Sequence, residues 1–220
     1  MNEFYTRLEK DLIGIDGGNI TAPLWLSGLE WGTSDEGIID CVTRPTYENA
    51  DYIVPFLSSK WKSENSSLYK WQFDQKIAKI LCHVFDYEGT YKEYMEKNYC
   101  DKESNEFKLN LFPLSAANMD EWTEKHINIT QTKIKYHYKT YCSMFRFKLL
   151  HDLAIKFKPK VIVCFGPGHV EEFKMAFWGK NHPSSQTKIE KMISDKNKLQ
   201  ILITENLPTL IIAPFLGRNS

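Results

Sequence analysis

The sequence predicts an α/β fold, a three-layer α/β/α domain with a central, mostly parallel four-stranded sheet. Four short apolar segments have the length and composition of buried strands: Leu24–Ser27, Phe107–Leu111, Lys160–Phe165 and Thr209–Ala213. Helical patterns separate these segments, and strands that alternate with helices are typical of a parallel sheet covered on both faces. The chain has 220 residues, so we expect a single domain over residues 1–220.

The spacing of apolar residues predicts the elements between the strands. Helices are expected over Glu3–Leu12, Ser66–Tyr87, Thr130–Phe157 and Gly166–Trp178, with a short exposed helix inside Glu88–Glu106. The stripe within Thr130–Phe157 is the strongest, and Pro159 ends it. The stretch from Thr33 to Ser63 is rich in proline and turn-forming residues, so we expect a long loop. Gln200–Thr204 is expected to be a short extra strand.

Composition restricts the classes of partner. The 28 acidic and 28 basic residues balance, so a nucleic-acid partner requires a local basic patch. Five cysteines, an odd number without a C-x-x-C pair, favour neither a disulfide framework nor a zinc site. The first residues lack a basic stretch followed by an apolar one, and no segment approaches the ~20 apolar residues that span a bilayer. We therefore expect a cytoplasmic monomer with no membrane association and no bound metal.

Chemically capable residues follow the predicted strands. Ligands of open α/β sheets bind outside the carboxyl ends of parallel strands, so these residues are expected to share one pocket. Glu30 stands between two glycines beside Trp31, just past the first strand. A carboxylate there can orient water or stabilise a developing cation, and the neighbouring tryptophan would raise its pKa. The alternative for Glu30 is an exposed loop glutamate.

Two further residues have side chains that suit recognition of a nucleic-acid base. Asn110 carries an amide within an apolar stretch, and an amide can read the donor and acceptor groups of a base edge. Phe56 follows Val54 and Pro55 on a stiffened loop that can present the ring as a stacking wall. A structural asparagine and an ordinary core phenylalanine are the respective alternatives.

The carboxyl-terminal segment has the composition of a wedge. Pro214, Phe215, Leu216 and Gly217 form a rigid apolar loop, and Arg218 and Asn219 follow it. Such a loop can enter a base stack while the guanidinium holds phosphate. A frayed chain end is the alternative.

Taken together, these segments resemble the uracil-DNA glycosylase superfamily, most closely its single-strand-selective monofunctional branch. Gly28-Leu-Glu-Trp-Gly32 resembles the glycine-rich first motif with its water-activating residue, and Asn110-Leu-Phe-Pro-Leu114 resembles the asparagine motif of the second strand. Pro159–Gly166 is similar to the third strand, and Ala213–Asn219 takes the place of the His-Pro-Ser motif that enters the minor groove. Phe56 takes the place of the aromatic residue that stacks on the flipped base.

The resemblance implies a uracil-DNA glycosylase-like fold and a set of functional residues. Catalysis would rest on Glu30 and Asn110. Base binding would involve Gly28, Leu29, Trp31, Phe56 and Asn110, and DNA binding would involve Pro214, Phe215, Leu216, Gly217, Arg218 and Asn219.

The chain also departs from the pattern of the family. Trp31 replaces a proline, and Glu30 stands where asparagine or aspartate is commoner. Ala213 replaces the histidine that stabilises the departing base, a loss of ~2.7–4 kcal/mol by analogy with an oxyanion donor. His169, at the same end of the sheet, is a candidate substitute.

The function that the sequence favours is hydrolysis of the N-glycosidic bond of a damaged or modified base in duplex or single-stranded DNA. This monofunctional reaction implies no metal or organic cofactor, because water is the nucleophile. Repair and defence against modified foreign DNA are both open roles. The alternatives are a catalytically impaired nucleic-acid-binding homologue and a nucleotide or nucleoside N-glycosidase, which suits the neutral net charge.

Overall fold

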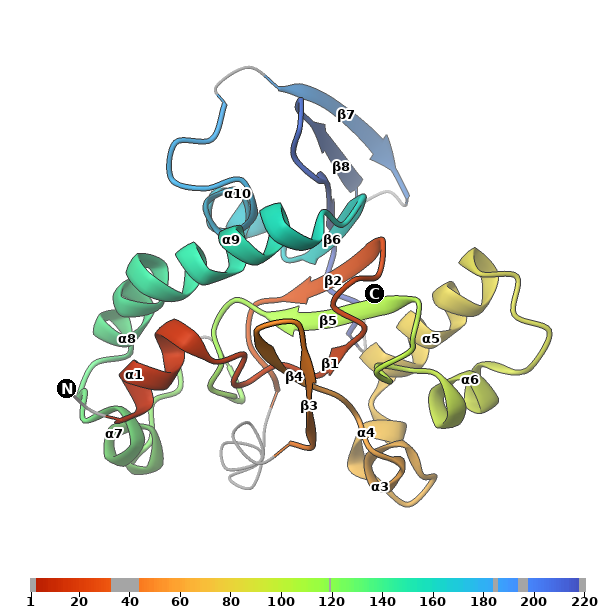
Figure 1. Cartoon of the computed structure of the whole chain (residues 1–220), viewed down its shortest axis with the longest axis horizontal. Coiled ribbons are helices and arrows are strands. Elements are labelled where there is room, and N and C mark those ends of the chain that lie inside the picture. Colours follow the sequence, from red (N-terminus) through yellow and green to blue (C-terminus); the bar gives the residue numbers. More distant parts are fainter. Residues whose placement is uncertain (1–2, 33–43, 119, 184–185, 194–197, 218–220) are drawn as a thin grey trace.

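A mixed seven-stranded sheet forms the centre of the molecule in the computed structural model, which describes residues 3–32, 44–118, 120–183, 186–193 and 198–217 (Figure 1). The strand order is β1-β5-β2-β6-β9-β8-β7. These strands are β1 (Gly17–Gly18), β2 (Leu24–Gly28), β5 (Glu106–Asn110), β6 (Val161–Phe165), β7 (Thr187–Met192), β8 (Lys198–Ile203) and β9 (Thr209–Ala213). The predicted α/β class is confirmed.

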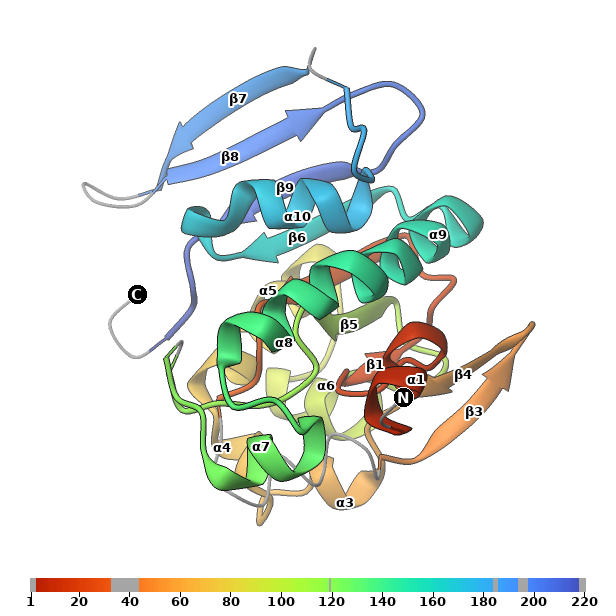
Figure 2. The same cartoon turned by 90° about the vertical axis from the view of Figure 1, so that its left-hand side faces the viewer.

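The four predicted strands lie together in the middle of this sheet. β5, β2, β6 and β9 are neighbours in that order, and every adjacent pair among them is parallel. The prediction of a four-stranded sheet is wrong in extent, because antiparallel strands extend both edges: β1 beside β5, and the β8–β7 pair beyond β9. β1 consists of two glycines and β7 is exposed along its whole length, so neither has the apolar pattern of a core strand. Figure 2 shows β7 and β8 extending this edge of the sheet.

Helices cover both faces of the sheet (Figures 1 and 2). One face carries α1 (Glu3–Lys10), α7 (Glu124–Thr130), α8 (Lys135–Tyr141), α9 (Phe147–Phe157) and α10 (Val170–Phe177). The other carries α3 (Ser59–Lys62), α4 (Ser67–Lys70), α5 (Gln72–Val84) and α6 (Tyr91–Lys97). Successive strand residues point to opposite faces, so Trp25 belongs to the first core and Leu26 to the second. No helix in the described ranges is both long and apolar enough to cross a bilayer.

The helix predicted over Thr130–Phe157 is divided in three. α8 passes into a five-residue π-helix, η1 (Cys142–Arg146), which continues as α9. Arg146 at the end of η1 is fully buried, and its Nε donates to the carbonyl oxygen of Leu111 over 3.0 Å. Its Nη2 also donates to the carbonyl oxygen of Asn110 at 3.3 Å. The π-helix thus places the Arg146 guanidinium against the backbone carbonyl groups at the end of β5.

The predicted long loop from Thr33 to Ser63 contains regular structure. Residues 33–43 lie outside the described residues. After them come a two-stranded hairpin of β3 (Thr46–Asn49) and β4 (Tyr52–Pro55), and then α3. The hydroxyl group of Tyr47 donates to the carbonyl oxygen of Gly18 over 2.6 Å, which attaches the hairpin to β1.

The buried Glu106 at the start of β5 gives the fold a predicted pH dependence. Its carboxylate accepts from the Tyr94 hydroxyl group at 2.6 Å and from the Cys100 N–H at 2.9 Å, but burial raises its pKa to about 7 from 4.5. A carboxyl group whose pKa is raised by folding binds its proton more tightly in the folded protein than in the unfolded one. The free energy of unfolding therefore falls as the pH rises from 4.5 to about 7. Relative to wild type, Glu106→Gln is expected to gain about 2–3 kcal/mol of unfolding free energy between pH 5 and pH 8.

Chemical denaturation at the two pH values measures this gain. The exposed neighbour Glu103 provides the matched control, since Glu103→Gln should follow the wild-type pH dependence. Parallel pH profiles for Glu106→Gln and the wild type would contradict the prediction.

Candidate functional site

A cavity of about 360 Å³ opens at the carboxyl ends of β2 and β5, on the sheet face that α5 and α6 cover. This volume lies within the range of small-molecule binding sites, about 300–1,000 Å³. Four segments distant in sequence line it: Gly28, Glu30, Trp31 and Gly32 at and after the end of β2; Lys70, Trp71, Gln72, Phe73 and Asp74 from the end of α4 into α5; Lys108 and Asn110 on β5; and Phe215 and Gly217. The structure therefore brings Glu30, Trp31 and Asn110 to one place.

Asn110 lies on the cavity floor with an unused donor. It is 3% exposed, and its Nδ2 has no hydrogen-bond partner among the described residues. Gly28 pairs with it across the parallel β2–β5 ladder. A Cβ atom at Gly28 would lie only 2.3 Å from Asn110 Oδ1, so the absence of a side chain at Gly28 makes room for the amide. A buried amide nitrogen without a partner is rare in folded proteins, so this donor calls for a partner that the described residues do not supply.

Glu30 presents one free carboxylate oxygen. Its side chain is 6% exposed, and Oε1 accepts from Nζ of Lys135 at 3.0 Å. The other oxygen, Oε2, is buried without a hydrogen-bond partner in the described part of the chain. Burial raises the pKa of Glu30 above its ordinary value, and the positive charge of Lys135 partly opposes that rise. Lys135 thus holds the carboxylate through Oε1, and no described residue hydrogen-bonds to Oε2.

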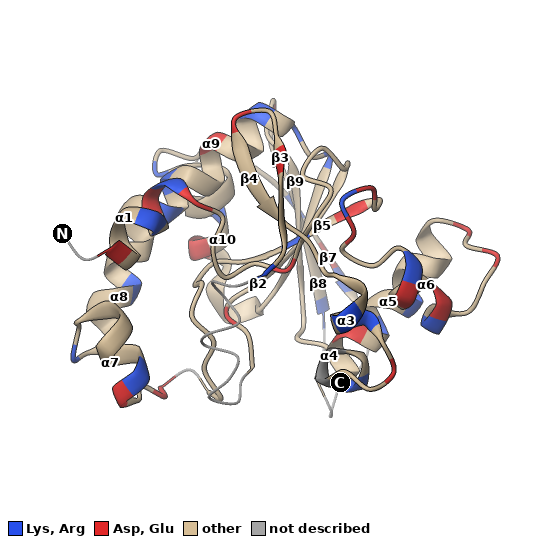
Figure 3. Cartoon of the chain, turned by 60° about the horizontal axis from the view of Figure 1, so that its bottom comes forward, with Lys and Arg blue, Asp and Glu red and all other residues tan. Residues whose placement is uncertain are grey.

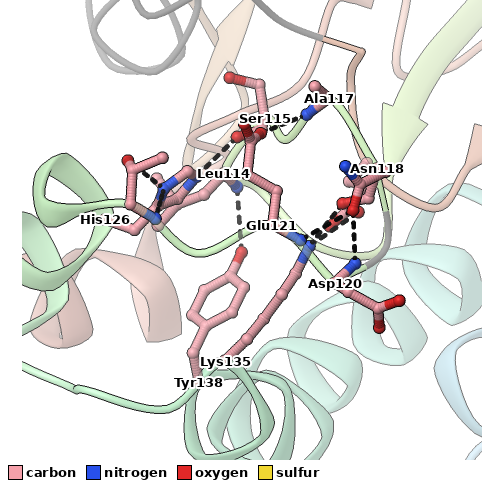
Figure 4. A network of polar contacts seen from close by, with 11 residues as sticks. Leu114, Ser115, Ala117, Asn118, Asp120, Glu121, His126, Lys135 and Tyr138 are labelled. Atoms are coloured by element: carbon pink, nitrogen blue, oxygen red, sulfur yellow. Dashed lines mark hydrogen bonds and ion pairs between the residues drawn. The ribbon is translucent and has the colours of Figure 1, made fainter.

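A network of polar contacts surrounds Lys135 and the segment that follows β5 (Figure 4). Its Nζ also donates to the carbonyl oxygen of Asn118 at 3.3 Å. One turn along α8, the Tyr138 hydroxyl group accepts from the backbone N–H of Leu114. His126 Nδ1 accepts from the Thr123 N–H, so its Nε2 carries the proton that is donated to the Ser115 carbonyl oxygen. Since both imidazole nitrogens are engaged here, His126 serves to order the segment that follows β5.

A buried ionic cluster underlies the cavity. Lys108 Nζ lies 2.9 Å from Asp16 Oδ2 and 2.6 Å from Asp74 Oδ1. Desolvation lowers the pKa of Lys108, but the two carboxylates outweigh it and raise the pKa above its ordinary value. Trp31 Nε1 donates to Asp16 Oδ2 at 3.2 Å, and the Arg44 guanidinium lies over the Trp31 ring, 4.1 Å from its centroid. These contacts lock the indole that forms one wall of the cavity.

The aromatic face of the cavity comes from α5. Phe73 and Phe215 stack with ring centroids 5.0 Å apart and an interplanar angle of 14°. Phe215 is 59% exposed, so it covers the mouth rather than the interior. The expectation that Phe56 would supply the stacking ring is corrected: Phe56 is absent from the described lining and packs against the ring of Tyr47, 6.1 Å away. The hairpin of β3 and β4 carries it away from the strand ends.

The other residues singled out from the sequence lie around the cavity or beyond it. Leu29 packs against the core of the opposite face and approaches Gly166. Pro214, Leu216 and Ala213 line a second, apolar cavity of about 550 Å³ beside α5. Arg218 and Asn219 lie outside the described residues. His169 Nδ1 lies 3.1 Å from Glu172 Oε1, and His169 is not among the described residues of the first cavity, so its expected role there is not supported.

Sequence reasoning missed Phe73, Asp74, Lys108 and Asp16. The strand Glu106-Phe-Lys-Leu-Asn110 contained a usable signal, because its polar residues alternate with apolar ones; that all five are buried is shown only by the structure. Residues of such a strand with the same parity share a face, which places Lys108 beside Asn110. Asp74 resembles an ordinary acidic residue in the first turn of a helix, so its sequence position carries no comparable signal.

The charged residues outside the cavity form neither a patch of one sign along α1, α5 and α6 (Figure 3) nor, in the described ranges, a metal-binding cluster. Basic and acidic residues are interspersed along α1, α5 and α6 (Figure 3). Within the described ranges, no three His, Cys, Asp or Glu side chains gather in a way that could hold a metal ion.

Comparisons with protein-family models, curated proteins and solved structures give no match. The likeness to the uracil-DNA glycosylase superfamily therefore rests on the motifs of the sequence alone.

Proposed function

We propose that this protein hydrolyses the N-glycosidic bond of a damaged or modified base in DNA, after the base has rotated out of the helix into the cavity. The observation that carries this proposal is the shared location of Glu30 and Asn110, each with a buried unpaired polar atom, beside the ring of Phe73. Rotating a base out of the stack costs a few kcal/mol, and a closely fitting pocket offsets this cost.

Each group has a distinct role in the proposed reaction. The base stacks on Phe73 in place of the exposed Phe215 ring, a contact worth ~1–3 kcal/mol, and accepts a hydrogen bond from Asn110 Nδ2. Glu30 Oε2 accepts from a water molecule, whose oxygen bonds to the anomeric carbon of the sugar. The bond from that carbon to the base nitrogen breaks with its electrons passing to the base. The proton lost by the water passes to Glu30, acting as general base, and the departing base takes up a proton from solvent to become the neutral free base.

Lys108 is our candidate for the group that stabilises the departing base. The family histidine is replaced by Ala213, which lies in the apolar cavity. The ammonium group of Lys108 lines the first cavity and lies 5.4 Å from the centroid of the Phe73 ring, on which the base would stack. Asp16 and Asp74 offset the positive charge of Lys108, so its contribution is a hydrogen bond from its third N–H to the base rather than a net positive field.

The test is incubation with a panel of DNA duplexes and single strands carrying different modified bases, with mass spectrometry of the released bases. The proposal predicts a free base together with an abasic site in the DNA. Intact DNA for every base in a broad panel would refute it.

Gly28→Ala is expected to abolish most of this base release, since its methyl group must displace the Asn110 amide. Alanine suits the backbone of a strand, so the fold should be retained, while loss of the base contact should lower kcat/KM at least about tenfold. Gly168→Ala is the matched control, because Gly168 is exposed outside the cavity and a Cβ atom there meets no heavy atom within 4 Å. Equal activity of the two variants would show that the Asn110 position is unimportant.

A nucleic-acid-binding homologue without catalysis is the second candidate, favoured by Ala213 in place of the family histidine. Binding of DNA that weakens steeply with salt, without an abasic product from any base, would select it. Release of a base from a free nucleoside, without retardation of DNA, would instead select a nucleoside N-glycosidase.

A further inference from the structure

We infer that the cavity selects a pyrimidine with an exocyclic amino group, the cytosine pattern, over one with a keto group in that position. This inference rests on the proposed function, because it identifies the class of base that the cavity would receive. It is carried by three buried polar groups that line the cavity: Asp74, Lys108 and Asn110.

Asp74 provides a fixed acceptor. The residue is fully buried, and its Oδ1 accepts from the Tyr99 hydroxyl group and from Lys108 Nζ, both at 2.6 Å. These two bonds orient the carboxylate, and Oδ2 has no hydrogen-bond partner within the described residues. An ionised carboxylate can only accept, so its free oxygen calls for an N–H group on the ligand.

Lys108 and Asn110 provide donors next to that acceptor. An ammonium group has three N–H donors, and the contacts with Asp16 and Asp74 use two of them. Asn110 lies two residues further along β5, so its side chain points to the same face, and its Nδ2 is unpaired. We place the three groups in the order Asp74, Lys108, Asn110, because Lys108 Nζ contacts Asp74 directly and Lys108 precedes Asn110 by two residues on β5.

The pairing edge of cytosine complements this order. It presents an amino donor, a ring-nitrogen acceptor and a carbonyl acceptor, which would face Asp74, Lys108 and Asn110 in turn. Uracil presents a carbonyl acceptor and a ring N–H in the first two positions. Its carbonyl oxygen would therefore face the free oxygen of Asp74, and its N–H would face the ammonium group of Lys108.

Binding of 1-methylcytosine and of 1-methyluracil to the intact protein tests the inference without requiring catalysis, since the methyl group takes the place of the sugar. Calorimetry or ligand-observed NMR should show tighter binding of 1-methylcytosine by about tenfold or more. Equal affinities, tighter binding of 1-methyluracil, or binding of neither compound would overturn the inference.

Asp74→Asn sharpens the test, because the amide can turn its NH₂ group toward a carbonyl oxygen. The preference for 1-methylcytosine should fall below about twofold or invert. Asp51→Asn, at a side chain that is 92% exposed, should leave the preference unchanged. A folded Asp74→Asn protein with the full preference would refute the role of Asp74, and if that variant fails to fold, the wild-type ratio alone decides.

Failure of this inference is distinguishable from failure of the proposed function. Release of uracil-type bases but not cytosine-type bases from DNA would support the glycosylase and overturn the amino selectivity. Selective binding of 1-methylcytosine by a protein that releases no base from any DNA would support the selectivity and overturn the glycosylase.

Discussion

Replacement of Glu30 by glutamine is expected to lower the rate of base release by about 10²–10⁴-fold, the usual contribution of a general base. Glutamine has nearly the same shape and can still accept a hydrogen bond from Lys135, so the cavity should keep its form. It cannot take the proton that the attacking water loses. The effect should therefore appear in kcat measured with saturating DNA, while the affinity for DNA stays near that of the wild type.

The pH profile gives an independent check on Glu30. Only the ionised carboxylate can act as a base, and burial raises the pKa of Glu30, so wild-type activity should rise with pH as this group ionises. The rise should be absent from the residual activity of Glu30→Gln. Glu48→Gln, an exposed position on β3, serves as the matched control and should keep full activity. Wild-type rates for Glu30→Gln would exclude the assigned role.

Replacement of Lys108 by methionine is expected to lower the free energy of unfolding by about 3–5 kcal/mol, the range for a buried ion pair that loses one partner. Methionine approximately fills the volume of the lysine stem but removes the cation that Asp74 contacts, and it leaves Asp16 with the more distant Arg44 guanidinium at 3.6 Å. The loss should be smaller at acidic pH, because protonation removes the charge of an uncompensated carboxylate. Denaturant titration at pH 5 and pH 8 measures both effects.

Lys148→Met is the matched control for this experiment. Lys148 forms an ion pair with Asp152 four residues along α9, and both side chains are largely exposed, at 71% and 47%. An exposed pair of this kind contributes about 0.3–0.5 kcal/mol. If Lys108→Met were no more destabilising than this control, the ionic cluster would have no structural importance.

The central part of the fold was predictable because it depends on local pattern. Three of the four runs, Leu24–Ser27, Lys160–Phe165 and Thr209–Ala213, are short, mostly apolar and bounded by glycine or proline, which is typical of a strand buried on both faces. Edge strands lack this pattern. β1 contributes only two glycines and β7 buries no residue, so their pairing is decided by backbone hydrogen bonds to neighbours.

The sequence by itself determined which residues follow the parallel strands, and therefore that Glu30 and Asn110 lie at one edge of the sheet. Strand periodicity and chain direction suffice for this, because both are local properties. Only the tertiary structure decided which ring completes the cavity and which charges lie beneath it. Phe73 and Asp74 come from the start of α5, and their approach to Lys108 depends on how that helix packs on the sheet. Side-chain contacts between elements far apart in the chain arise only from such packing, and no local spacing encodes them.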